Sequence, residues 1–169
     1  MANVRVWEDD PLAGAVAVQR AQAKLPKSPL GITIDVPVVL KEAKVVFNLD
    51  HLAFEGDEPT GLSFLRVLTG RFRADGTKAD VVAIFHGAAG YMLLDDEAYD
   101  RVRNWRGGNP YKDQIAALLA AGVAIEECGQ TMRDMHWVNA DLLPGVKVNT
   151  SANLRIIQLV QDGYVQIQP

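Results

Sequence analysis

Residues 80–90, DVVAIFHGAAG, combine a run of apolar, β-branched side chains with an abrupt glycine-rich ending. Such a run is typical of a strand that is buried on both faces of a parallel sheet. Similar short runs recur along the chain, at residues 44–50 (KVVFNLD), 123–128 (VAIEEC), 146–149 and 164–167. We therefore expect five strands.

Stretches with helical character separate these runs. In residues 61–74 the apolar side chains recur at the spacing of one helix face, and further helical stretches cover residues 91–104, 109–121, 131–143 and 151–161. Strands that alternate with helices of about 10–15 residues are typical of right-handed βαβ units. The sequence therefore predicts an α/β protein, a three-layer α/β/α sandwich with a mainly parallel five-stranded sheet.

The first part of the chain has a different character. Residues 1–43 hold four prolines, which interrupt regular structure, and one Ala/Val-rich stretch at residues 12–25 that is compatible with a helix. We interpret residues 1–43 as a partly helical N-terminal extension that packs on the domain or on a neighbouring subunit. Residues 44–169 are then the α/β domain.

Composition narrows the class of protein. The chain has 169 residues, of which 49% are hydrophobic and 22% charged, and no stretch approaches the roughly 20 apolar residues of a membrane span. We therefore expect a soluble protein. Its net charge is −4, and the sequence has no long runs of like charge, which argues against nucleic acid and anionic membranes as partners.

The redox chemistry and the compartment are less constrained. Because there is one cysteine, no internal disulfide can form. The acidic residues among the first ten positions do not fit a signal peptide. The sequence is thus compatible with a cytoplasmic protein if the chain is native and full-length, and with a periplasmic one if it is a mature form without its leader.

Polar and reactive residues follow three of the expected strands. Because ligands of open parallel sheets bind beyond the carboxyl ends of the strands, we expect Cys128, His86 and Asp50 to share one edge of the sheet. The candidate reactive residue is Cys128, and the candidate binding residues are Asn48, Asp50, His86, Gly87, Gly90 and Gly129.

Two interpretations of Cys128 remain open on the sequence. A thiol at the junction of a strand and a helix gains thiolate character from the helix dipole and free N–H groups, whereas a buried cysteine often serves as a small apolar side chain. Glu126 and Glu127 would raise the thiol pKa if they lay close. Strand alternation places Glu127 on the face opposite Cys128, so Glu126 is the expected antagonist.

The HGAAG segment at residues 86–90 resembles the oxyanion-loop glycines of α/β-hydrolases, but the chain holds no G-x-S-x-G nucleophile elbow. Two alternatives stay open: a backbone anion site, or a tight turn with a structural His86. Nucleotide, zinc-protease and C-x-x-C signatures are also absent, so we predict no cofactor. A metal could use Cys128 with His86 or His51, but these residues lack ligand spacing and no metal site is predicted.

In combination, several segments resemble the DsrE/DsrF-like family. These are KVVFNLD, VVAIFHGAAG, the NPY that opens a helix, GVAIEECGQTM, DLLPGVKV and SANLRIIQLVQDGY, which together span about residues 44–169. The resemblance implies a parallel α/β/α fold and homotrimers, hexamers or other small oligomers. It also implies that a cysteine at this strand end, here Cys128, accepts a persulfide sulfur and passes it to a partner protein. The chain departs from the best-understood members because no Arg-Arg-Gly follows the cysteine and an N-terminal extension is present.

Three functions therefore compete. The first is a persulfide carrier that uses Cys128 for sulfur transfer, with a sulfur donor or acceptor protein as partner. The second is a non-catalytic module that binds a small anion or a metal. The third is a structural oligomer in which Cys128 is inert and buried.

We predict that the protein is a homo-oligomer, with a trimer or hexamer favoured by the family resemblance. The apolar stretch at residues 12–25 and the tryptophans near helix ends, Trp105 and Trp137, exceed what a small monomer exposes. Light scattering should give a multiple of the 18.5 kDa chain mass. A single-chain mass across a wide concentration range would contradict this prediction.

Overall fold

The computed structural model describes residues 31–169. The chain divides into two units, Met1–Val39 and Leu40–Pro169, each considered by itself. Residues 31–39 contain no helix or strand. The helix expected at residues 12–25 lies outside the described residues.

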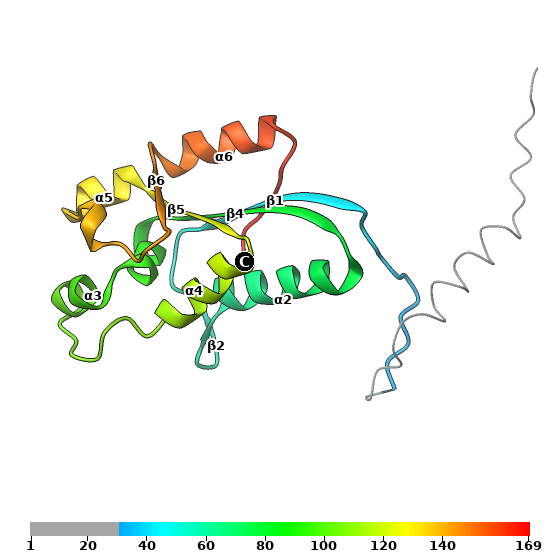
Figure 1. The fold of residues 1–169 in the computed structure, drawn as a ribbon, viewed down its shortest axis with the longest axis horizontal. Coiled ribbons are helices and arrows are strands. Elements are labelled where there is room, and N and C mark those ends of the chain that lie inside the picture. Colours follow the sequence, from blue (N-terminus) through cyan, green and yellow to red (C-terminus); the bar gives the residue numbers. More distant parts are fainter. Residues whose placement is uncertain (1–30) are drawn as a thin grey trace, which may run out of the picture. The chain divides into compact units, whose positions relative to one another are not determined.

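The second unit is built on a five-stranded sheet (Figure 1). Its strands are β1 (Glu42–Leu49), β4 (Lys78–Phe85), β5 (Ala124–Cys128), β6 (Lys147–Asn149) and β7 (Val165–Ile167), in the order β6-β5-β4-β1-β7. Every neighbouring pair runs parallel. The predicted α/β fold with a parallel five-stranded sheet is confirmed.

Helices cover both faces of this sheet (Figure 1). One face carries α2 (Thr60–Asp75), α3 (Asp96–Arg103) and α4 (Lys112–Ala120), and the other carries α5 (Gly129–Met135) and α6 (Ala152–Gln161). Within residues 31–169, no helix is both long and apolar enough to cross a membrane.

The two helical layers bury opposite faces of the strands. Phe47 and Phe85 belong to the larger apolar cluster, under α2 and α4. Val46 and Ile84, one position away in the same strands, pack with Ile156 of α6 in the smaller cluster. This alternation follows from the period of two in a strand, where successive side chains point to opposite faces.

Two expected helices differ from the structure. Residues 91–104 are not one helix, because a 3₁₀ segment η1 (Gly87–Leu93) comes first and α3 begins only where the Asp95 carboxylate accepts a hydrogen bond from the Ala98 N–H at 2.7 Å. Asp95 thus acts as a new N-cap, which starts a separate helix.

The helix expected over residues 131–143 is also shorter. It ends at Met135 because His136 adopts a left-handed conformation with φ of 57°, and a 3₁₀ turn η2 (Asn139–Asp141) follows. The sequence interpretation also missed a small hairpin formed by β2 (Phe54–Glu55) and β3 (Glu58–Pro59).

Candidate functional site

Cys128 is the last residue of β5 and faces the α6 side of the sheet. Its residue is 4% exposed, and it belongs to the same apolar cluster as Ile84 of β4 and Ala152 and Ile156 of α6. The thiol is therefore covered by the first turn of α6 rather than open to solvent.

Hydrogen-bond donors surround the sulfur. The backbone N–H of Ala152, at the start of α6, donates to Sγ at 3.2 Å. Burial raises the pKa of the Cys128 thiol, but the N–H groups of Thr131, Ala152 and Gln130 and the Thr131 hydroxyl lower it, and the net pKa lies below that of an ordinary cysteine. The Cys128 side chain forms no capping hydrogen bond with the first turn of α5. The bond from the Ala152 N–H of α6 does meet the distance of a hydrogen bond to sulfur. Donors of this kind favour the thiolate.

Glu126, the expected antagonist, shares the α6 face with Cys128 but is paired. The Arg155 guanidinium of α6 donates to the Glu126 carboxylate from Nε and Nη2, with Nη2–Oε1 at 2.9 Å. Asn149 of β6 donates to the same carboxylate at 3.2 Å. The negative charge of Glu126 is thus balanced by a bidentate arginine on the helix that covers the thiol.

Glu127 has the opposite environment. It is 0% exposed, and neither carboxyl oxygen has a hydrogen-bond partner among residues 31–169. Burial raises the pKa of Glu127 to about 9; the Cys128 backbone N–H lowers it and the charge of Cys128 raises it. Both oxygens lie under η1, where a Cβ on Gly90 would stand 2.9 Å from each of them. Gly90 therefore leaves room for a buried carboxyl on the face of β5 opposite Cys128.

Polar residues in and just after the last residues of β1 and β4 form a second group at the same edge, with Asn48 inside β1 and Asp50, His51 and His86 beyond the strand ends. The His86 Nε2–H donates to Asn48 Oδ1 at 2.7 Å. Burial lowers the pKa of His86, and the charge of Asp50 opposes this shift. The Asp50 carboxylate is bonded to His51 and accepts from Gln168 at 3.4 Å. The hydrogen bond with His51 is the main cause of the lowered pKa of Asp50.

The glycine-rich segment after β4 uses its N–H groups within the protein. Gly87 N–H donates to Thr131 Oγ1 at 2.9 Å, and Ala88 N–H donates to the Asp50 carbonyl at 3.2 Å. Gly87 has φ of +55°, and a Cβ there would stand 2.8 Å from the Asp50 carbonyl oxygen. The segment therefore ties the ends of β1 and β4 to α5.

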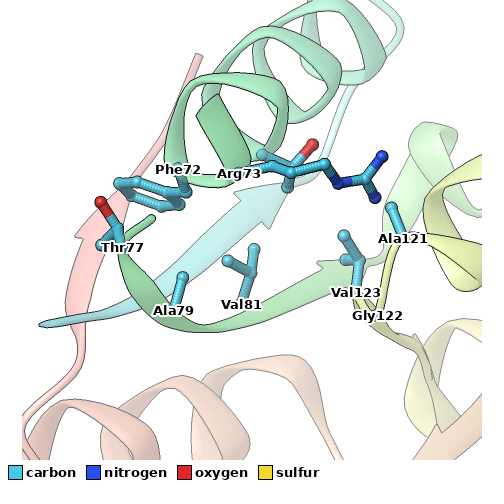
Figure 2. Close-up of a pocket in the computed structure, with 9 residues that line it drawn as sticks. Phe72, Arg73, Thr77, Ala79, Val81, Ala121, Gly122 and Val123 are labelled. Atoms are coloured by element: carbon cyan, nitrogen blue, oxygen red, sulfur yellow. The ribbon is translucent and has the colours of Figure 1, made fainter. Parts of the chain in front are cut away.

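Three cavities within residues 31–169 bear on the search for a site. A groove of about 470 Å³ lies beside the Cys128 end of β5, along β6 and the start of α6, and Glu126, Asn149, Ser151 and Arg155 are among its lining residues. A cleft of about 440 Å³ separates α2 from α4. A smaller cavity of about 150 Å³ (Figure 2) lies at the amino ends of β4 and β5, where Arg73 extends from α2 toward Ala121. Of the three, the groove is the one that borders the register partner of Cys128, Asn149.

Metal chemistry finds no support in the part of the chain that the structure describes. No group of three His, Cys, Asp or Glu side chains there is arranged to hold an ion. Of the residues weighed as metal ligands, His86 is bonded to Asn48 and His51 to Asp50.

The sequence model of the DsrE/DsrF-like family matches residues 42–169. The chain belongs to the DsrE/DsrF-like family. No curated protein matches it. Among solved structures it is similar to the protein of unknown function MTH1491 from Methanobacterium thermoautotrophicum, at 23% identity and a TM-score of 0.56 over 75% of this chain and 99% of that one. It is also similar to the ychN protein from E. coli, at 14% identity and a TM-score of 0.51 over 78% of this chain and 100% of that one. These likenesses support the fold.

Within this DsrE/DsrF-like fold, the predicted residues fall into separate contacts. Asn48 binds His86, Gly87 binds Thr131, and Gly90 lies over Glu127, while Gly129 approaches the Asn149 carbonyl so closely that a Cβ would stand at 2.6 Å from it. Sequence reasoning missed the residues that act on the thiol and its neighbours, which are Thr131, Asn149, Ala152 and Arg155. Thr131 and Asn149 follow or end strands and could have been found by that signal, whereas the roles of Ala152 and Arg155 depend on how α6 docks.

We predict that Glu127→Gln stabilises this DsrE/DsrF-like domain at neutral pH. Because the folded pKa lies near 9 and the ordinary value near 4.5, folding takes up a proton between these values. Wild-type stability therefore falls as pH rises through that window, by roughly 1.4 kcal/mol per pH unit, and Gln lacks this loss. Urea unfolding at pH 5 and pH 8 measures the difference.

Glu126→Gln is the matched control for this prediction. Glu126 forms an ion pair with Arg155, so its replacement should destabilise the protein at pH 8. A stability difference between Glu127→Gln and wild type that is the same at both pH values would contradict the protonated state of Glu127.

Proposed function

We propose that the protein carries sulfur as a persulfide on Cys128 and passes it to the thiol of a partner protein. The observation that carries this proposal is the hydrogen bond from the Ala152 N–H to the Cys128 sulfur, at 3.2 Å, with a net lowering of the thiol pKa. Membership of the DsrE/DsrF-like family, which is sulfur-relay-like, supports the same chemistry.

The exchange needs no outside oxidant. The Cys128 thiolate attacks the outer sulfur of a donor persulfide, an S–S bond forms at Sγ, and the donor's S–S bond breaks with its electron pair leaving on the donor thiolate. The acceptor thiolate then attacks the outer sulfur on Cys128, and Cys128 leaves as a thiolate. Both steps start or end with an anionic sulfur at this position, so donors that stabilise a thiolate serve both.

The electrostatics of the α6 face agree with this role. The Glu126 carboxylate would oppose a second anion on the same face, but Arg155 neutralises it. The Ala152 N–H belongs to the first turn of a ten-residue helix, whose positive dipole end favours negative charge. The site therefore tolerates an anionic sulfur although it is covered.

Access is the main requirement that the geometry imposes. Cys128 is 4% exposed, so a donor sulfur must approach from the adjoining groove, where Asn149 and Ser151 lie beside the covering turn. We propose that residues 150–151, which connect β6 to α6, shift to admit the sulfur. A shift there would expose Sγ without separating the strands.

The same burial favours a second candidate, a structural oligomer with an inert cysteine. In support of it, Leu154, Ile157 and Val160 of α6 are 61%, 54% and 46% exposed and form one apolar stripe. Such a stripe suits a contact between subunits. The two candidates differ in whether the folded protein exchanges sulfur.

The test is intact-mass analysis after incubation of the folded protein with a persulfide donor. The carrier proposal predicts a gain of one sulfur atom that is lost on reduction and absent in Cys128→Ser. Urea-unfolded wild type is the matched control, since it presents the same thiol without the fold. If the unfolded chain gains sulfur and the folded protein does not, the structural candidate holds and the carrier proposal fails.

A further inference from the structure

We propose that the Glu127 carboxyl and the Cys128 thiol are a coupled pair that holds a single negative charge at the end of β5. The coupling follows from the position of the two groups in the fold. Its consequence for sulfur transfer rests on the function proposed above.

The first support is the placement of Glu127. It precedes Cys128 directly, and alternation sends its side chain through the opposite face of the strand, under η1. There the residue is 0% exposed, and in the part of the chain that the structure describes neither carboxyl oxygen has a hydrogen-bond partner. A buried polar group without partners costs free energy, and packing alone does not offset that cost.

The second support is the absence of compensating charge around it. The neighbours of Glu127 across the sheet are Phe85 of β4 and Val148 of β6, and Gly90 covers it from η1. None of these carries a charge. Glu126 and Arg155 face the other side of the sheet and pair with one another. Among residues 31–169, Cys128 is the ionisable side chain whose charge acts on this carboxyl.

The surroundings therefore favour the anion of the Cys128 thiol but not the anion of the Glu127 carboxyl. The thiol receives N–H donors from α5 and α6, which stabilise its anion, whereas within residues 31–169 no side chain donates to the carboxyl. When Cys128 is anionic, a second charge one residue away is disfavoured and Glu127 keeps its proton. When Cys128 is neutral, Glu127 loses its proton more readily.

For the proposed sulfur carrier, this coupling has a specific effect. Thiolate and persulfide anion are both compatible with a protonated Glu127, so the strand end keeps one charge throughout the exchange. An ionised Glu127 would instead raise the cost of forming the thiolate. Glu127 is thus a positioning residue that acts through the charge state of Cys128.

Infrared spectroscopy tests the coupling directly, because a protonated carboxylic acid has a C=O band separate from that of carboxylates. The band that disappears in Glu127→Gln and persists in Glu126→Gln is assigned to Glu127. Its loss with rising pH is then followed in wild type and in Cys128→Ser, whose hydroxyl stays neutral. We expect the midpoint to fall by about one pH unit in Cys128→Ser, the size given by two like charges in neighbouring residues.

Protein alkylated at Cys128 with iodoacetamide, which makes the sulfur neutral, should show the same lowering. Equal midpoints in wild type and Cys128→Ser would overturn the coupling. A band that is already absent at pH 6 in wild type would overturn it as well. Neither outcome depends on sulfur loading, so a failure of the carrier proposal in the mass assay leaves this test intact.

Discussion

The pairing of β4 with β1 on one side and β5 on the other is the constraint on which the rest of the structure depends. β1 and β4 are each eight residues long and pair along their whole length, and the last residues of β4 pair with β5. Because all three run parallel, their carboxyl ends meet at one edge. That register brings Asn48, His86 and Cys128 to the same edge from positions far apart in the chain.

The same pleat explains why two adjacent glutamates have opposite roles. Glu126 faces α6, where Arg155 is within reach and forms an ion pair with its carboxylate. Glu127 faces η1, where Gly90 makes room for it but offers no donor, and its pKa is raised to about 9 by burial. A difference of one position along β5 thus places one glutamate in an ion pair and the other in a buried site that raises its pKa. Cys128, next in the strand, returns to the α6 face and meets the N–H of Ala152.

Much of this could be predicted from sequence, because the strands are short apolar runs with clear polar ends. The five strands, their parallel direction and the shared edge of Cys128, His86 and Asp50 follow from that pattern. The extent of the helix after Cys128 does not, since it ends where His136 takes a left-handed conformation that many sequences would avoid. The pairing of Arg155 with Glu126 depends on how α6 docks, 29 positions away in sequence, and no local pattern reports it. The position of Gly90 over the Glu127 carboxyl depends on how η1 packs on β5, which no local pattern reports.

We infer that Cys128 is a reactive thiol although its residue is 4% exposed. The most direct measurement is the rate of iodoacetamide labelling of the folded protein across pH, compared with its rate of unfolding under the same conditions. The account predicts labelling faster than unfolding, with a pH midpoint below the value of about 8.5 for an ordinary cysteine. Labelling that is only as fast as unfolding would show that Cys128 is an inert part of the core.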